Sequence, residues 1–253
     1  MNLTGSTILV TGGGSGIGRG LAEAFHALGN QVIVAGRRKQ ALDETTAANP
    51  GMQSLQLDIE DAAAIRAFAA EATAKFPALN VVINNAGIMR AEKLLHQQED
   101  LADATAIITT NLLGPIRLTA ALMPHLKKQQ QATIMNVSSG LAFMPLAFTP
   151  TYCATKAALH SYTLSLRYQL RSTPIEVLEL APPYVATDLM SGKSDPRAMP
   201  LEKYIAEVME ILKQQPTPAE ILVENVKALR FAAENGKHDA IFEGLNAGFA
   251  DAI

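Results

Sequence analysis

Tyr152 and Lys156 are the residues of this sequence best suited to move a proton. They stand four positions apart within residues 151–171, whose pattern predicts a helix, so their side chains share one helix face about one turn apart. A free phenol has a pKa of about 10, which is too high for proton transfer near neutrality. A nearby ammonium group stabilises the phenolate and would lower the pKa of Tyr152. Such pairs also occur by chance, so the surrounding elements must supply the context.

A glycine-rich turn, residues 11–18, follows the first apolar run. Its spaced glycines are Gly12, Gly16 and Gly18, and a second register that starts two residues later also fits the bare pattern. Glycine lets the backbone approach a pyrophosphate closely. A helix that begins near Ile17 would then offer free N–H groups to phosphates. The turn therefore predicts a dinucleotide cradle rather than only a tight connection.

The residues after the second apolar run identify the expected dinucleotide. A site for NAD(H) usually places an acidic residue there to hold the ribose 2′-hydroxyl. This sequence has Gly36, Arg37, Arg38 and Lys39 instead. Guanidinium groups bind phosphate in a bidentate manner, and cations at a helix start are unfavourable unless an anion is present. We therefore expect NADP(H) rather than NAD(H).

Short apolar runs alternate with helical patterns along the chain and position these groups. Runs without polar alternation predict strands covered on both faces, at residues 7–10, 31–35, 54–57, 79–83, 133–137 and 175–180. Helical patterns cover residues 17–28, 61–75, 101–128 (bent near Gly114) and 151–171. Repeated strand–helix–strand units predict an α/β fold with a parallel sheet. No linker divides residues 1–253, so we expect a single domain.

Composition excludes several other classes of protein. The 253 residues carry a formal net charge of −3, without the basic surplus of a nucleic-acid binder. The lone cysteine, Cys153, excludes an intrachain disulfide and is interpreted as a small buried residue. No metal site is expected, because no His/Cys cluster has ligand spacing. No targeting segment or membrane span is visible, so we expect a cytoplasmic protein with no membrane or nucleic-acid partner.

These motifs, in this order and spacing, resemble the short-chain dehydrogenase/reductase family over nearly the whole chain. The stretches that carry the resemblance are Thr11–Gly18, Asn84–Gly87, Asn111, Ser139, Tyr152–Lys156 and Pro182–Thr187. The resemblance implies a doubly wound Rossmann sheet of six or seven strands in the order 3-2-1-4-5-6. Pro182-Pro183, residues 139–143 and the Leu245-Asn246 ending are similar to its DltE-type branch.

The resemblance also implies roles for individual residues. Tyr152 would be the general acid/base, and Lys156 would bind the ribose and depress the pKa of Tyr152. Ser139, 13 residues before Tyr152, would bind the substrate carbonyl oxygen, and Asn111 would hold a water in a proton relay. We interpret Ser138 as a strand-end residue bonded to backbone. His160 is interpreted as a packing or satisfied polar residue.

The remaining expected contacts fall into two groups. Asp58 either meets the adenine amino group or caps the next helix. The expected cofactor-binding residues are Gly12, Ser15, Gly16, Ile17, Gly18, Arg37, Arg38, Asp58, Ile59, Asn85, Ala86, Gly87, Tyr152, Lys156, Pro182, Val185 and Thr187. The expected substrate pocket, which suits a small and mostly hydrophobic carbonyl or alcohol, comprises Leu141, Phe143, Phe148, Tyr184 and Met190.

Two features depart from the common pattern of the family. Pro183 replaces the usual glycine and removes a backbone donor, which leaves the nicotinamide contacts open. No strand is evident in residues 236–246, where most members have a terminal strand that contributes to a tetramer interface. We therefore expect a homodimer through the two long helices rather than a tetramer, with Ala120, Ala121, Leu159, Tyr162 and Leu166 on the shared face. Residues 187–216 are expected to form a substrate lid.

The expected function is an NADPH-dependent carbonyl reductase, or an alcohol dehydrogenase in the reverse direction. Two alternatives stay open at this point. One is a catalytically silent NADPH-binding regulatory protein, against which the complete set of Asn111, Ser139, Tyr152 and Lys156 argues. The other is an epimerase or dehydratase that uses the same Tyr/Lys pair without net consumption of NADPH.

Overall fold

Seven parallel strands form one sheet in the computed structural model, which describes residues 1–96, 100–190 and 195–248. The strand order is β3-β2-β1-β4-β5-β6-β7. The strands are β1 Thr7–Thr11, β2 Gln31–Gly36, β3 Gln53–Gln56, β4 Leu79–Asn84, β5 Ala132–Val137, β6 Ile175–Leu180 and β7 Glu220–Ile221. The expected α/β class, single domain and order of the first six strands are confirmed.

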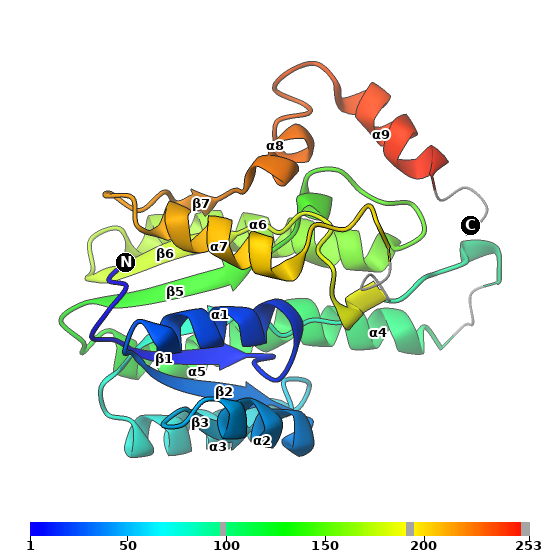
Figure 1. Ribbon diagram of the computed structural model, residues 1–253. Coiled ribbons are helices and arrows are strands. Elements are labelled where there is room, and N and C mark those ends of the chain that lie inside the picture. The colour runs from blue at the N-terminus through cyan, green and yellow to red at the C-terminus, as the bar shows by residue number, and fades with distance from the viewer. Residues whose placement is uncertain (97–99, 191–194, 249–253) are drawn as a thin grey trace.

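Helices cover both faces of the sheet (Figure 1). They are α1 Gly16–Ala27, α2 Lys39–Ala48, α3 Ala62–Lys75, α4 Ala102–Ile108, α5 Gly114–Leu126, α6 Pro150–Leu170, α7 Leu201–Leu212, α8 Glu224–Arg230 and α9 His238–Ala247. Successive residues of β1 point to opposite faces. Ile8 and Val10 pack in the core with α1 and α7, and Leu9 packs in the core with α3, α5 and α6.

The expected bend in the long helix is a short π-helical segment, Thr109–Leu113, between α4 and α5. At its end Gly114 lies so close to Ile59 that a Cβ would stand 2.6 Å from the Ile59 side chain. Among the described residues, one helical stretch, Ala102–Leu126, is long and apolar enough to cross a membrane by length and composition. Its buried residues Leu118 and Leu122 pack in the core with α3, as those of a soluble core helix do.

The C-terminal part of the chain differs from the expectation. Residues 236–246 contain no strand, but the sheet has a seventh strand earlier, β7, which pairs with β6 through Glu179 and Leu180. We did not identify β7 in the sequence because two residues are too few to form an apolar run. The helix α9 follows and carries no buried residue. It is attached by Asn246, whose side chain bonds Ala147 N at 2.6 Å and Pro145 O at 3.2 Å.

Two of the residues expected at a dimer face lie inside the protomer. Leu159 and Leu166 are buried between α6 and the chain's own core. The large apolar side chains that α4, the π-helical segment and α6 expose are instead Ile108, Leu113, Leu164 and Tyr168. The sequence pattern assigned the inward stripe of α6 to the interface because a helix buried on one face and exposed on the other can carry apolar residues on both.

Candidate functional site

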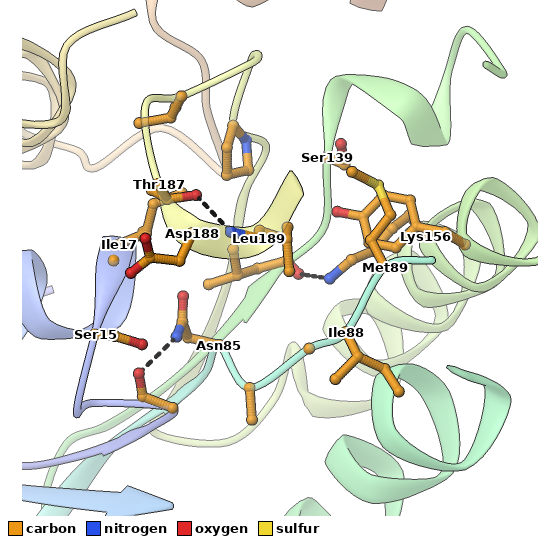
Figure 2. Close-up of a pocket in the computed structure, with 18 of the residues that line it drawn as sticks. Ser15, Ile17, Asn85, Ile88, Met89, Ser139, Lys156, Thr187, Asp188 and Leu189 are labelled. Atoms are coloured by element: carbon orange, nitrogen blue, oxygen red, sulfur yellow. Dashed lines mark hydrogen bonds between the residues drawn. The ribbon is translucent and has the colours of Figure 1, made fainter. Parts of the chain in front are cut away.

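A cavity of about 790 Å³ opens beside the carboxyl ends of the strands, where ligands bind in open parallel sheets. It extends from Arg37 and Arg38, after β2, to Tyr152 and Lys156 on α6. Figure 2 shows Ser15 and Asn85 on one side of the cavity and Ser139, Met89 and Lys156 on the other. The phosphate cradle and the reacting groups predicted from the sequence therefore share one continuous space.

The glycine-rich turn has the geometry of a phosphate cradle. Gly12 and Gly16 have φ values of +67° and +54°, which favour glycine. A Cβ on Gly18 would stand 2.3 Å from Asn85 Nδ2 and 2.4 Å from Gly12 O, so any side chain there would push the turn apart. Ser15 caps α1 without a side-chain hydrogen bond. The first N–H groups of α1 are therefore not capped by that side chain, and the turn fits a dinucleotide pyrophosphate.

Arg37 and Arg38 mark the far end of the cavity. The Arg38 guanidinium donates to Ser15 Oγ at 3.0 Å, so a cation and a hydroxyl from two different turns meet there. Arg37 pairs with the Glu60 carboxylate at 2.9 Å. Helix α2 begins directly after Arg38 without an acidic residue in its first turn and without a side-chain cap. This end of the cavity suits an additional anionic group.

The loop after β4 is fastened to the glycine-rich turn. Thr11 Oγ1 accepts hydrogen bonds from the N–H groups of Asn85 and Ala86, each at 3.0 Å. Asn85 Nδ2 donates to Thr11 O at 2.9 Å. Ala86 and Gly87 line the cavity. Because alanine has only a methyl group and glycine has no side chain, the backbone of this loop is open to a ligand. The Asn85 side chain therefore holds this loop against the glycine-rich turn.

Tyr152, Lys156 and Ser139 converge at the opposite end of the cavity. Lys156 Nζ stands 5.6 Å from the centre of the Tyr152 ring and donates to Val137 O at 2.8 Å. Ser139 precedes a short 3₁₀ turn. Its Oγ accepts a hydrogen bond from Leu141 N in that turn, at 3.1 Å. Tyr152 and Lys156 are buried, so the surroundings of the two ionisable groups are largely dry.

Burial sets the protonation of both groups. Desolvation raises the pKa of Tyr152, and the hydrogen bond with Ser139 acts in the opposite direction. Desolvation lowers the pKa of Lys156 to about 8, and the negative charge of Glu179 opposes that shift. The upward shift in the Tyr152 pKa comes from burial of the phenol, so the expected depression of that pKa by Lys156 stays a prediction. Near neutrality Tyr152 retains its proton, which suits a proton donor.

Asn111 lies beside these groups but not in the cavity lining. Its side-chain Oδ1 accepts from Ile88 N at 2.9 Å, and its Nδ2 donates to Ile88 O at 2.8 Å. The π-helical segment turns Asn111 inward, where it is buried. The Asn111 side chain therefore holds the loop after β4 through both backbone groups of Ile88. Its expected role in a proton relay stays a prediction.

The structure brings most of the predicted site residues to the cavity wall. The predicted residues that line it are Gly12, Ser15, Gly16, Ile17, Arg37, Arg38, Ile59, Asn85, Ala86, Gly87, Ser139, Leu141, Phe148, Tyr152, Lys156, Pro182, Tyr184, Val185 and Thr187. Pro183 lines it as well. Four predicted residues do not, namely Gly18, Asp58, Asn111 and Phe143, and the side chain of a fifth, Met190, lies outside the described residues.

These five residues have different positions. Asp58 accepts from Glu60 N at 3.0 Å, and the residue that caps α3 is Asp61 instead. Phe143 packs edge-on against His160, with ring centres 4.8 Å apart. The side chain of Met190 lies outside what the structure describes, as do residues 191–194 of the expected lid. The lid therefore stays a prediction, although α7, within the same stretch, packs on α1.

Several lining residues were missed by sequence reasoning. Leu229 and Leu245 reach the cavity from the C-terminal segments, and Asp195 and Arg197 reach it from the segment before α7. Asp195 and Arg197 form an ion pair at 2.7 Å, which lowers the pKa of the Asp195 carboxyl. No local motif marks these residues, because only the tertiary fold brings them to the strand ends. Ile88 and Met89 could have been found, since they directly follow the Asn84–Gly87 motif.

Comparisons with known proteins agree with this geometry. The family model described as short chain dehydrogenase matches residues 6–198. The "uncharacterized oxidoreductase DltE" of Bacillus subtilis (strain 168) is 41% identical over 97% of this chain and 98% of its own length. The 3-oxoacyl-[acyl-carrier-protein] reductase FabG of Escherichia coli (strain K12) is 32% identical over 77% of this chain and 80% of its own. The crystal structure of a short chain dehydrogenase from Burkholderia cenocepacia J2315 in complex with NADP has a TM-score of 0.81 and 25% identity, and covers 97% of this chain and 99% of that chain.

Proposed function

The chain belongs to the short-chain dehydrogenase/reductase family, and on that premise we propose that it is an NADPH-dependent carbonyl reductase. Its substrate would be a small, mostly hydrophobic ketone or aldehyde. The observation that carries the proposal is the single cavity that joins a phosphate cradle and an arginine-bearing end to Tyr152, Ser139 and Lys156. A dinucleotide that lies in the cradle would bring its reactive end to the three polar side chains.

The arginine-bearing end favours NADPH over NADH. Arg38 and Ser15 already meet at 3.0 Å, and both can bind a 2′-phosphate. The half-exposed Arg37 can add a second guanidinium group after rotating from Glu60. The end of β2 has no carboxylate in the position that would hold a ribose 2′-hydroxyl. The complex of the Burkholderia cenocepacia relative with NADP adds support.

The chain's own residues would supply proton transfer and orientation. When bound, the nicotinamide supplies the hydride that adds to the carbonyl carbon. The Tyr152 hydroxyl donates its proton to the carbonyl oxygen, which becomes the alcohol. The Ser139 hydroxyl holds that oxygen in place, and the Lys156 ammonium stabilises the phenolate that remains on Tyr152. The protonated phenol is the form of Tyr152 that donates in this direction, and its phenolate is the form that accepts a proton in the reverse direction.

The substrate end of the cavity is mostly apolar. Its wall beyond Tyr152 comprises Met89, Leu141, Leu146, Phe148, Leu229 and Leu245. The charged side chains at this end, Asp195 and Arg197, pair with each other, and Tyr184 donates to Asp195 at 3.2 Å. An apolar carbonyl compound fits such a wall better than a phosphorylated sugar does.

A panel of carbonyl compounds tests the proposal. Consumption of NADPH would be followed by absorbance for small aliphatic and aromatic ketones and aldehydes, in parallel with NADH. We expect turnover of hydrophobic members and a preference for NADPH. A strong preference for NADH would contradict the argument from Arg38. Tight binding of NADPH without turnover of any carbonyl would favour the regulatory alternative, and product formation without net NADPH consumption would favour an epimerase or dehydratase.

Tyr152→Phe removes the proposed proton donor and little else. We expect kcat to fall by about 10²–10⁴-fold, because a positioned general acid contributes that much, while the dissociation constant for NADPH, measured by fluorescence, changes little. Tyr168→Phe is the matched control, since Tyr168 is exposed on the same helix. Equal kcat values for Tyr152→Phe and the wild type would refute the assigned role.

A further inference from the structure

Glu179 is a fully buried carboxylate on β6, the strand next to the edge strand β7. It belongs to β6 and pairs in register with Asn136 of β5. Burial of a charged side chain without partners costs several kcal/mol. The contacts of the Glu179 carboxylate must therefore offset this cost. None of the roles assigned above uses it.

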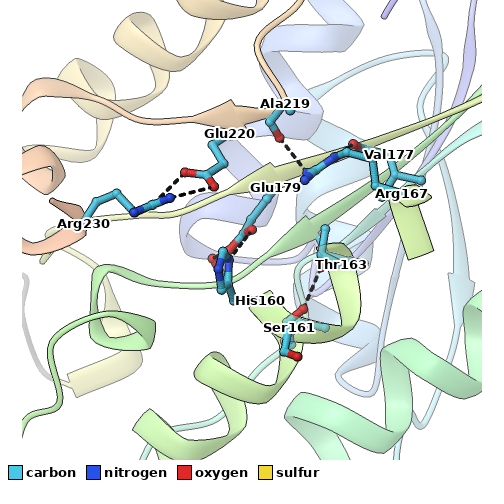
Figure 3. Close-up of polar contacts among 12 residues, drawn as sticks. His160, Ser161, Thr163, Arg167, Val177, Glu179, Ala219, Glu220 and Arg230 are labelled. Carbon is cyan, nitrogen blue, oxygen red and sulfur yellow. Dashed lines mark hydrogen bonds and ion pairs between the residues drawn. The ribbon is translucent and has the colours of Figure 1, made fainter. Parts of the chain in front are cut away.

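Both oxygens of Glu179 are bonded to residues adjacent to the site. Ser138 Oγ donates to Glu179 Oε1 at 2.5 Å. His160 Nδ1 stands 2.8 Å from Glu179 Oε2 (Figure 3). Ser138 directly precedes Ser139, which binds Tyr152. His160 lies one helical turn after Lys156 on α6. The expectation that Ser138 bonds only backbone is therefore wrong, because a buried acceptor from the neighbouring strand reaches its hydroxyl.

Lys156 is connected to the contacts of Glu179. Its Nζ donates to Val137 O at 2.8 Å, so the chain that holds Lys156 continues through Ser138 to Glu179. The charge of Glu179 also acts on Lys156 and favours its ammonium form. Glu179 is thus linked to Lys156 in three ways. Ser138 and the adjacent Val137 carbonyl form one link, His160 on the same helix forms the second, and the attraction between the two charges forms the third.

The titratable and charged groups around Glu179 come from three elements. Lys156, His160 and Arg167 belong to α6, Glu220 belongs to β7, and Arg230 belongs to α8. The polar atoms of His160, Glu179 and Glu220 lie within 4.8 Å of one another, a grouping that could suggest a metal. Arg230 holds both oxygens of Glu220, at 2.7 and 3.1 Å. With that guanidinium in place the Glu220 carboxylate already has a cationic partner, so we do not assign the cluster as a cation site.

We propose that Glu179 is a positioning residue for the reaction: its carboxylate fixes the Ser138–Ser139 turn and supplies the negative charge that keeps Lys156 an ammonium ion. The inference deepens the proposed function, since it concerns the same site. Without the charge of Glu179, the dry surroundings of Lys156 would favour the neutral amine at lower pH. Without its hydrogen bond, Ser139 would lose the support of its neighbour.

Glu179→Gln removes the charge and keeps the size, so it tests the electrostatic part. The Lys156 midpoint would be followed by NMR of ¹³Cε-labelled lysine, with the signal assigned by its loss in Lys156→Met. We expect a midpoint near pH 8 in the wild type and a decrease of about 0.5–1 unit in Glu179→Gln. Glu176→Gln, in the same strand but paired with the N-terminus, should keep the wild-type midpoint. Equal midpoints in Glu179→Gln and the wild type would overturn this part.

Ser138→Ala and Glu179→Asp test the positional part. Ser138→Ala keeps the charge, and Glu179→Asp keeps it but cannot reach both partners. For each we expect kcat/KM to fall by about 3–30-fold, as a misplaced group lowers the rate, with the Lys156 midpoint unchanged within about 0.3 unit. Wild-type kcat/KM in both variants would overturn the positional part, even if Glu179→Gln did not fold.

Activity adds a second reading of the same variants. In the wild type, kcat/KM should fall as pH rises through the Lys156 midpoint, and this limb should move to lower pH in Glu179→Gln only. The NMR midpoints need no substrate. A wild type that reduces no carbonyl would therefore count against the proposed function, while the midpoints would still decide whether Glu179 acts on Lys156.

Discussion

Burial of Lys156 beside Tyr152 lowers the stability of the folded protein, because the ammonium group loses its hydration. Lys156 is an ammonium ion at neutral pH in surroundings that lower its pKa to about 8. In the unfolded chain the same group has a pKa of about 10.4. Below pH 8 Lys156 is therefore charged in both states, and this charge is less stable in the folded protein than in the unfolded chain. A site arranged only for stability would place an apolar side chain here.

Lys156→Met should make the protein more stable and inactive. We expect the free energy of unfolding at pH 7 to rise by about 1–3 kcal/mol, which is the desolvation of the ammonium less the lost bond to Val137 O. The unfolded wild type binds more protons between about pH 8 and 10.4. Wild-type stability should therefore gain on the variant as pH rises through that window. Urea unfolding at pH 7 and 9.5 measures both values, and a variant less stable than wild type at pH 7 would contradict the argument.

Single side chains also fix whole elements. Glu92 is buried in the loop after β4 and bonds the start of α6, where its carboxylate accepts from Thr151 N at 2.9 Å and Thr151 Oγ1 at 2.7 Å. Thr149, the residue before the helix, gives no side-chain cap. A carboxylate at a helix N-terminus is favourable with the helix dipole. Glu92 therefore caps the helix that carries Tyr152 from outside that helix.

Glu92→Ala should loosen the start of α6. We expect the free energy of unfolding to fall by about 1–3 kcal/mol, because two half-buried donors of Thr151 lose their acceptor. We also expect kcat to fall, because Tyr152 is one residue from the released bond. Glu71→Ala, which removes an exposed carboxylate from α3, is the control and should stay within about 0.5 kcal/mol of wild type. Unfolding and kinetics that match those of the control would show that α6 does not depend on this cap.

Elements with strong periodic patterns were predictable, and the others were not. The six apolar runs became β1 to β6 because both sheet faces are covered. The glycine turn and the Tyr152–Lys156 pair were recognisable because their chemistry depends on local spacing. The helix α9 was missed since its apolar face is short, with Ile241, Phe242 and Leu245 only half-buried. Glu179, Glu92 and Leu245 were missed since their roles depend on partners distant in the sequence.

At the scale of the whole molecule, exposed apolar side chains lie on helices that contact one another. Ile108, Leu113, Leu164 and Tyr168 are exposed on α4, the π-helical segment and α6. Exposed apolar side chains that gather on neighbouring helices are typical of an interface between protomers. We propose that these helices form a homodimer, with the inward residues Leu159 and Leu166 supporting the face from within.

Light scattering measures this assembly directly. We expect wild type at micromolar concentration to have twice the chain mass of 27.0 kDa. Leu164→Glu should shift it to the monomer, because a charge buried at an interface is unfavourable. Leu28→Glu, which places the same charge at an exposed leucine beyond α1, should leave the mass unchanged. A tetramer in wild type, or a dimer that persists in Leu164→Glu, would refute the assignment.

The attachment of α9 determines how the substrate end of the cavity exchanges with solvent. Among the described residues, the helix has no fully buried residue and is held by the packing of half-buried Leu245 and by the Asn246 bonds, which are worth about 1–3 kcal/mol together. Such a helix detaches for a small fraction of the time, independently of the sheet. Because Leu245 of this helix lines the cavity, each detachment opens the wall beside the reacting groups. Amide hydrogens of α9 should then exchange orders of magnitude faster than those of β5, and bulky substrates can enter without any strand being disturbed.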